Sequence, residues 1–248
     1  MTCRRFPRQA VHQGPLIVVN ARHPLQSGAA GKLAPVDARH PDILLEAAAG
    51  RLLACCIGAV RGGREIVPVS GWRSQTEQQA IWDQTLAESG EAFTRQYVAL
   101  PGCSEHQTGL AIDLGRAASH IDFIRPAFPY DGVCGAFRRA AARHGFIERY
   151  QAGKESLTGI SPEPWHFRYV GAPHAALLQK HGLCLEEYPD FLRQAGAQTC
   201  TLDGGRMAQV FYVPCAGEQT EIELPDACCQ VSGDNIGGFI VTVWGESA

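Results

Sequence analysis

Two short segments with histidine and acidic side chains most constrain what this chain can fold into. They are residues 104–113, SEHQTGLAID, and residues 163–166, EPWH. Pro162 and Pro164 make a helix over the second segment improbable, because each proline disfavours the helical conformation of the residue before it. The helical HExxH arrangement is absent. The second segment is therefore expected to be extended, with a bend if its glutamate and histidine are to face one site.

The first segment is expected to turn at a glycine and then enter a strand. His106 and Asp113 lie seven residues apart, and Gly109 stands between them to permit the bend. From residue 110 to 114, apolar positions alternate with small or polar ones, as they do on a strand that buries one face. Asp113 then points away from the buried side, which carries Leu110, Ile112 and Leu114.

Together the two segments supply the side chains of a catalytic zinc site. His106, Asp113 and His166 offer two imidazole nitrogens and one carboxylate, and Glu163 adds a second carboxylate three residues before the later histidine. Three protein ligands, an open position for water and an adjacent acid/base group are the usual parts of such a site. We therefore predict Zn²⁺ as the cofactor.

Each of these residues also has a structural interpretation. A single histidine among nine is more often structural than a ligand, and a lone aspartate on a strand is usually an edge or turn residue. Arg73 and Gln78 would ordinarily be a surface charge and a helix-face amide, and Trp72 and Trp165 would be core. The metal-site hypothesis depends on the combination. The other histidines are assigned structural roles: His12, His23, His40, His120, His144, His174 and His181.

Composition excludes several classes of protein. The chain has 248 residues, 45% of them hydrophobic and 19% charged, which is ordinary for a globular protein. Its net charge of −3 argues against a nucleic-acid binder, and the basic cluster Arg138, Arg139 and Arg143 is interpreted as a solvated helix face. No apolar run approaches the roughly 20 residues of a membrane span, and no export signal is found. We expect a cytoplasmic protein with reduced cysteines.

The pattern of elements predicts an α+β fold, with a mixed or antiparallel central sheet flanked by helices. Residues 1–182 would form the main domain, and residues 183–248 a helix followed by a small β-rich appendage. Helices are expected over 42–60, 74–89, 132–144, 173–181 and 186–194. Strands are expected over 16–20, 66–70, 110–114, 146–150, 165–170, 208–213, 220–224, 228–231 and 239–243. Residues 90–103 and 151–162 are expected to be loops.

The chain resembles a known family at three motifs. These are residues 70–74, SGWRS; residues 104–113, as Ser-x-His-x-x-Gly-x-Ala-x-Asp; and residues 163–171, EPWHFRYVG. Their order and spacing are similar to those of the zinc D,D-peptidases of the VanX/VanY type, particularly the combined dipeptidase/carboxypeptidase branch. The resemblance covers about residues 15 to 182. It implies a hedgehog/D,D-peptidase-like fold and a link to glycopeptide resistance. The family more often has tyrosine where Trp72 stands.

The resemblance also implies residue roles. His106, Asp113 and His166 would bind Zn²⁺. Glu163 would move a proton from the attacking water to the leaving amine, and Arg73 would stabilise the oxyanion. Ser104 and Gln78 would hold the substrate's terminal carboxylate. The implied substrates are D-Ala-D-Ala and the UDP-linked muramyl pentapeptide of a cell-wall precursor.

Several points stay open at this stage. The sequence does not decide between the dipeptide and the pentapeptide, nor does it give the oligomeric state. The alternatives to a D,D-peptidase are a cell-wall endopeptidase of the endolysin type and a zinc-bearing binding module without activity. The presence of both Glu163 and Arg73 argues against the binding module.

Overall fold

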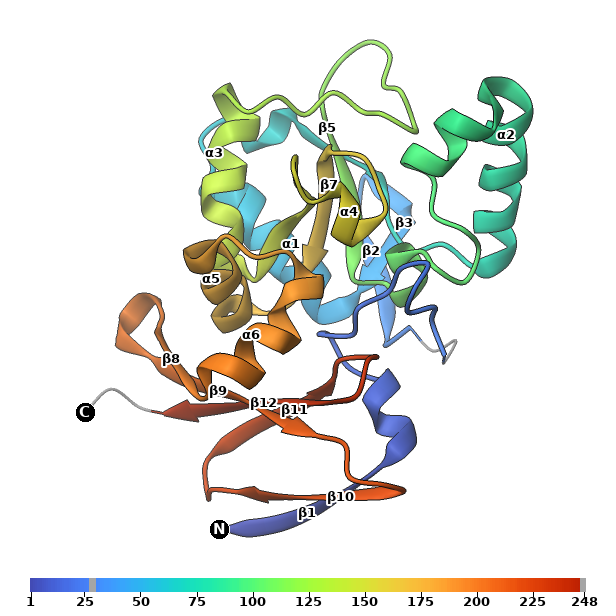
Figure 1. Cartoon of the computed structure of the whole chain (residues 1–248). Coiled ribbons are helices and arrows are strands. Elements are labelled where there is room, and N and C mark those ends of the chain that lie inside the picture. The colour runs from blue at the N-terminus through green and yellow to red at the C-terminus, as the bar shows by residue number, and fades with distance from the viewer. Residues whose placement is uncertain (27–29, 246–248) are drawn as a thin grey trace.

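A four-stranded antiparallel sheet in the order β4–β5–β7–β6 lies at the centre of the structure, a computed structural model that describes residues 1–26 and 30–245 (Figure 1). The strands are β4 (Ile66–Ser70), β5 (Ala111–Arg116), β7 (Glu163–Tyr169) and β6 (Phe146–Tyr150). All four were predicted to within a few residues. With helices packed around an antiparallel sheet, the α+β prediction is confirmed.

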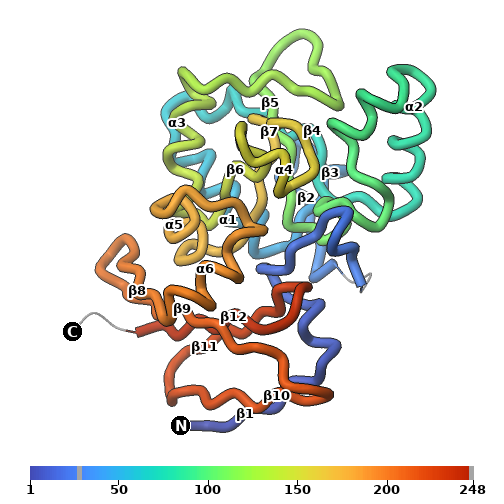
Figure 2. Tube along the Cα trace, viewed as in Figure 1, coloured from blue at the N-terminus to red at the C-terminus, as the bar shows by residue number. Residues whose placement is uncertain are grey.

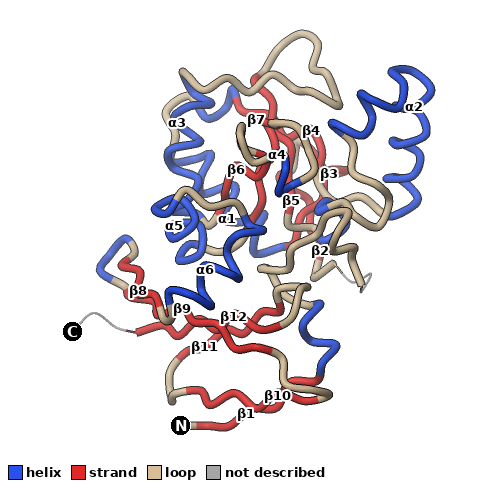
Figure 3. The backbone as a smooth tube through the Cα atoms, in the orientation of Figure 1, coloured by secondary structure: helices blue, strands red, loops and turns tan. Residues whose placement is uncertain are grey.

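Helices α1 (Ala47–Ala59) and α3 (Gly132–Ala141) bury the main core against this sheet. Phe137 of α3 is fully buried and meets Phe167 of β7 edge to face, with ring centroids 5.0 Å apart. Burying a side chain of this size stabilises a fold by about 1.5–3 kcal/mol. Helices α1 and α3 thus occupy one face of the sheet. Helix α2 lies on the other side of the strands from α3 in the view of Figure 3.

The predicted helix over residues 42–60 begins later than expected. Residues His40–Glu46 form strand β3, which pairs with β2 (Leu33–Asp37), and helix α1 starts only at Ala47. The side chain of Glu46 is the reason, because its carboxylate accepts hydrogen bonds from the backbone N–H groups of Ala48 and Ala49 and so caps the helix. The first residues of the periodic pattern were assigned to the wrong element.

Helix α2 (Gln75–Tyr97) runs through most of the segment predicted to be a loop. The expected capping box at its start is present, formed by Ser74 and Glu77. Gly90 adopts φ 81° and interrupts the helix, which then continues to Tyr97. The second predicted loop, residues 151–162, also contains one helical turn, α4 (Glu155–Thr158).

Residues 16–20 were predicted to be a strand and are not one. The segment is buried, and Leu16 and Val18 pack in a second core beneath α5 (Ala172–His181) and α6 (Tyr188–Ala195). Val18 bonds to the loop at Asp234, not to a neighbouring strand. A segment that is buried on all sides has the same run of apolar residues as a central strand. Hydrophobic periodicity therefore could not distinguish the irregular segment from a strand.

A second β layer lies below the main sheet (Figure 1). Its four-stranded sheet has the order β11–β12–β9–β8, and the two-stranded ribbon β1–β10 packs on it through residues such as Phe6 and Phe239. The strands are β8 (Gln198–Thr201), β9 (Met207–Pro214), β10 (Gln219–Leu224), β11 (Cys228–Gly233) and β12 (Gly238–Gly245). The sequence reasoning missed β8 and β1 (Thr2–Pro7). The predicted domain boundary at residue 182 stays a prediction. The second β layer is not built from residues after 182 alone, because it also contains β1 at the start of the chain (Figure 2).

His174 joins the second layer to the rest of the molecule. It is 3% exposed, and its ring nitrogens lie 2.9 Å from the hydroxyl of Tyr188 on α6 and 2.9 Å from that of Thr242 on β12. The structural role predicted for this histidine is confirmed.

Short 3-10 turns η1 to η6 occupy Arg8–His12, Gly63–Glu65, Glu105–Thr108, Ala142–His144, Leu185–Glu187 and Asp203–Gly205. Among the described residues, no helix is long and apolar enough to cross a membrane.

Candidate active site

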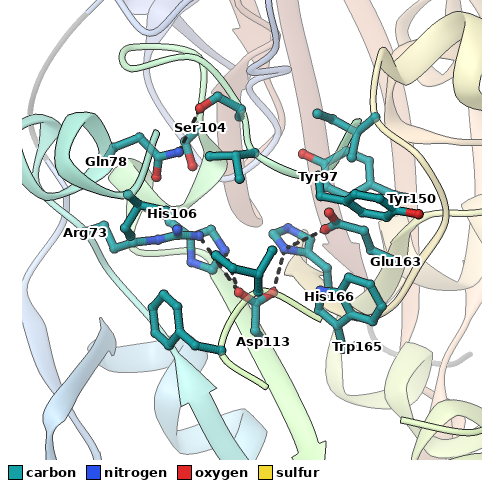
Figure 4. Close-up of a pocket in the computed structure, with 16 residues that line it drawn as sticks. Arg73, Gln78, Tyr97, Ser104, His106, Asp113, Tyr150, Glu163, Trp165 and His166 are labelled. Carbon is teal, nitrogen blue, oxygen red and sulfur yellow. Dashed lines mark hydrogen bonds and ion pairs between the residues drawn. The ribbon is translucent and has the colours of Figure 1, made fainter. Parts of the chain in front are cut away.

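Three predicted metal ligands converge at one end of the central sheet (Figure 4). Asp113 of β5 and His166 of β7 are direct partners in the antiparallel register, so their side chains face the same side. His106 comes from the 3-10 turn η3 just before β5. All three are buried, and one ligand atom from each lies within 4.8 Å of the others. Asp113 Oδ1 is 2.8 Å from His166 Nδ1, and Oδ2 is 3.1 Å from His106 Nε2.

The backbone fixes which nitrogen of His106 faces the site. Its Nδ1–H donates to the carbonyl of Gly71 at 2.6 Å, which leaves Nε2 as the nitrogen that faces Asp113. Gly109 ends the turn with φ 72°, and a Cβ there would come within 2.8 Å of Leu33. The glycine that was predicted to permit the bend is therefore required both by its conformation and by the space around it.

A bulge in β7 brings Glu163 and His166 to the same site. Glu148 of β6 pairs with Phe167, whereas Tyr150, two residues on, pairs with Glu163, four residues back along β7. The extra residues remove the strict alternation of a strand, so positions three apart can share a face. Glu163 Oε2 lies 3.8 Å from His166 Nδ1. The predicted bend is confirmed, and no cis peptide bond occurs among the described residues.

The protein's own charges give the three ligands unlike ionisation states. Burial alone would raise the pKa of Asp113, but the two imidazoles hold it well below its usual range. Burial and the nearby Arg73 lower the pKa of His106 to about 4. Burial also opposes the charged form of His166, but Asp113 outweighs it and raises the pKa to about 9. At neutral pH a cation would therefore compete with a proton mainly at His166.

Glu163 has the properties of a proton carrier. It is buried, and burial raises its pKa to about 8, with the charge of Asp113 acting in the same direction. A carboxyl group whose pKa lies near neutrality can both accept and return a proton. Arg73 stands on the other side of Asp113, with Nη2 3.8 Å from Oδ2. Burial lowers the pKa of Arg73, and its Nε has no hydrogen-bond partner among the described residues.

The two predicted carboxylate-binding residues line the same pocket (Figure 4). Ser104 is buried beside His106, at the start of η3. Gln78 is buried one turn into α2 and donates to the carbonyl of Ala99 at 2.7 Å. Its side-chain nitrogen carries a second proton, and its Oε1 has no partner among the described residues. All seven predicted site residues therefore lie around one pocket.

Sequence reasoning missed several residues at the pocket. Tyr97 and Tyr150 line it, and the ring of Tyr150 lies 4.8 Å from that of His166. Trp165 was assigned to the core; it packs there and lines the pocket as well. Glu105 is buried directly behind His166. Its place in the first motif was the only available signal, and the motif alone gave it no role.

The donor set fits zinc. Two imidazole nitrogens and a carboxylate oxygen are the ligands of many catalytic zinc sites. Among the described residues, the hydrogen-bond and ion-pair partners of His166 Nδ1 and His106 Nε2 are carboxylate groups. The positions of the donor atoms therefore suit a divalent ion held between them.

Comparisons with known proteins agree with this geometry. The VanY family, described as D-alanyl-D-alanine carboxypeptidase, matches residues 43–172. The chain is 40% identical over 185 residues to the bifunctional D-Ala-D-Ala dipeptidase and carboxypeptidase VanXYC of Enterococcus gallinarum, covering 74% of this chain and 97% of that one. It is 30% identical over 255 residues to a D-alanyl-D-alanine carboxypeptidase of Enterococcus faecium, covering 97% and 78%.

Solved structures show how far the likeness extends. The vancomycin-resistance D,D-dipeptidase VanXYg, in complex with a D-Ala-D-Ala phosphinate analogue, matches with a TM-score of 0.95 at 45% identity, over 98% of this chain and 99% of that one. A mutant of the D,D-pentapeptidase VanY in complex with Zn(II) matches with a TM-score of 0.59 at 32% identity, over 70% and 98%. The likeness to VanXYg thus includes the second β layer, and the chain belongs to the VanY family of D-alanyl-D-alanine carboxypeptidases.

Proposed function

We propose that this chain is a zinc-dependent D,D-peptidase. It hydrolyses the dipeptide D-Ala-D-Ala, removes the terminal D-alanine of the peptidoglycan precursor pentapeptide, or does both. The observation that carries the proposal is the buried convergence of three ligand atoms with a carboxyl group and a guanidinium. The relatives support the substrate class and the link to glycopeptide resistance, since their names specify D-Ala-D-Ala hydrolysis and vancomycin resistance.

His106, Asp113 and His166 are proposed to hold Zn²⁺. The metal, when bound, supplies a Lewis acid that polarises the scissile carbonyl and lowers the pKa of water. The hydrogen bond from His106 to Gly71 supports this role, because it leaves the other ring nitrogen free to bind.

Glu163 is proposed to be the general base and then the general acid. It removes a proton from the attacking water and delivers that proton to the amine of the leaving D-alanine. Its position beside His166 in the buried pocket supports the assignment. Arg73 is proposed to stabilise the negative charge that develops on the carbonyl oxygen, as a fixed cation in a site with little water can do.

Ser104 and Gln78 are proposed to bind the free carboxylate of the substrate. The hydroxyl of Ser104 and the second amide proton of Gln78 are donors suited to a carboxylate. The existing hydrogen bond from Gln78 to Ala99 fixes the amide in place, which supports a preorganised role. Recognition of a free terminus would separate this enzyme from an endopeptidase.

The reaction is proposed to take place in the cytoplasm, where the precursor is made. All ten cysteines are free thiols in the structure, including the adjacent pairs Cys55–Cys56 and Cys228–Cys229. Such unpaired thiols are typical of proteins in a reducing compartment.

Release of free D-alanine tests the proposal. The zinc-loaded protein is incubated with D-Ala-D-Ala, with the precursor pentapeptide and, as a stereochemical control, with L-Ala-L-Ala. We expect D-alanine from at least one D,D-substrate, loss of that activity with a chelator, and recovery on adding zinc. The ratio of the two turnover rates at matched concentration decides between dipeptidase and carboxypeptidase. No release from either D,D-substrate by the zinc-loaded protein would overturn the proposal.

A further inference from the structure

A cluster of fully buried ionic groups lies directly behind the proposed metal ligands. Glu105 is 1% exposed, and Arg149 and Arg168 are 0% exposed. Oxygen Oε1 of Glu105 accepts a hydrogen bond from Arg149 Nε at 2.8 Å and forms an ion pair with Arg168 Nη1 at 2.8 Å. Burying three charged groups is costly unless their geometry is good. The energetic cost of burying this cluster next to a proposed active site indicates that it has a functional role.

The second oxygen of the carboxylate faces a metal ligand. Glu105 Oε2 lies 3.7 Å from Nε2 of His166, and neither atom has a hydrogen-bond partner among the described residues. The Glu105 oxygen is an acceptor, and the His166 nitrogen can be a donor. Their separation is slightly longer than an N–H···O hydrogen bond, which spans about 2.7–3.2 Å. The two unpartnered atoms are therefore complementary and nearly in contact.

We propose that Glu105 is the positioning residue for His166: it accepts the Nε2–H of the imidazole, and so holds the Nδ1 lone pair toward the metal. A neutral imidazole has one N–H and one lone pair, and the acceptor behind the ring selects which nitrogen binds. Metal-bound histidines almost always donate their other N–H to such an acceptor. His106 has a backbone carbonyl for this purpose, and Glu105 is the corresponding group for His166.

A bound zinc ion would replace the present hydrogen bond between His166 and Asp113. His166 Nδ1 and Asp113 Oδ1 are 2.8 Å apart. With zinc held by both residues, His166 Nδ1 would carry a lone pair and not a proton. The proton of the neutral ring would then be on Nε2, where Glu105 is the acceptor.

Glu105 is held by Arg149 and Arg168, and Arg149 is itself anchored by further partners. Arg149 donates to it through Nε and, through its other two nitrogens, to both oxygens of Glu186 in the 3-10 turn Leu185–Glu187. Glu186 also accepts from Asn20. The carboxylate that orients His166 is thus braced by the segment that leads into the second β layer.

The substitution Glu105→Gln tests the inference, which rests on the proposed zinc site. Arg149 and Arg168 would engage the amide oxygen, and the amide nitrogen would then face Nε2–H, donor against donor. Zinc affinity, measured by competition with a chromogenic chelator, should fall about 10- to 100-fold. The matched control is Glu148→Gln. Glu148 neighbours Arg149 and accepts from Arg138 and Tyr130, and it touches no metal ligand. It should keep wild-type zinc affinity.

A measurement on the unaltered protein covers the case in which Glu105→Gln fails to fold. Nitrogen-15 NMR of the zinc-loaded enzyme should show His166 protonated at Nε2, with a slowly exchanging proton, and metal-bound at Nδ1. Binding through Nε2, or a rapidly exchanging Nε2–H, would overturn the inference. So would a folded Glu105→Gln protein with zinc affinity within twofold of the wild type. If the wild type itself binds no zinc and releases no D-alanine, the proposed function fails instead.

Discussion

His174 should make the stability of this protein fall in mild acid. Its imidazole is buried between Tyr188 and Thr242, with both ring nitrogens in hydrogen bonds. A proton added to the ring would turn both nitrogens into donors, and no carboxylate is among these partners to balance the charge. The perturbation is a change from pH 7 to pH 5, applied to the wild type and to His174→Gln.

The pKa of His174 gives the size of the effect. Burial lowers the pKa to about 3, from an ordinary value of 6.5. The unfolded chain therefore binds a proton below pH 6.5 that the folded chain refuses. The stabilising contribution is fully present above pH 6.5 and is lost as the pH falls toward 3. Integration gives a loss of about 2 kcal/mol at pH 5, or about 4–8 °C in Tm for a chain of this size.

Urea unfolding of the metal-free protein at both pH values measures this loss. Other groups titrate in the same interval, so the informative quantity is the difference between the two proteins. His174→Gln is expected to be less stable at pH 7, because at least one buried hydrogen bond is lost at a cost of about 1 kcal/mol. Its further loss between pH 7 and pH 5 should be smaller than that of the wild type by about 2 kcal/mol. Equal losses in the two proteins would refute the reasoning.

Three further substitutions test other parts of the account. Glu163→Gln should lower kcat about 10²- to 10⁴-fold while metal analysis still finds zinc, because the residue carries a proton and not the metal; undiminished turnover would contradict its role. Gly109→Ala should lower Tm, since φ 72° and the approach to Leu33 both disfavour a Cβ, at a cost of more than about 1 kcal/mol. Glu186→Gln should weaken zinc binding in the same chelator competition, by less than Glu105→Gln does; equal weakening in Glu148→Gln would show a nonspecific effect.

The chemistry of the site was predictable because its residue types are informative in combination. His106, Asp113 and His166 are a zinc donor set in any fold, and the prolines around Glu163 exclude the helical alternative. The strand at Asp113 followed from simple alternation. What the sequence did not contain was the register, which sets Asp113 directly across from His166.

Local sequence patterns gave the wrong secondary structure where tertiary contacts decide the structure. Residues 42–46 fit a helical spacing, but they pair with β2 and the helix begins only after the cap at Glu46. Strand β1 was missed because its partner, β10, lies more than two hundred residues away. No local signal reports such a pairing.

Buried charges were the least predictable feature. Arg138 was interpreted as part of a solvated helix face, yet it is bonded to Glu148 and lies 4.0 Å from the ring centroid of Tyr130. Arg149 and Glu105 were assigned no role from the sequence. A charged residue is buried only when distant parts of the chain supply its partners, and the sequence alone does not pair them.

Anomalous scattering at the zinc edge, from crystals of the zinc-loaded protein, tests the central claim most directly. We expect one strong peak bounded by His106 Nε2, the carboxylate of Asp113 and His166 Nδ1, at about 2.0–2.2 Å from each. The absence of a peak among these three residues, in protein that still releases D-alanine, would contradict the account.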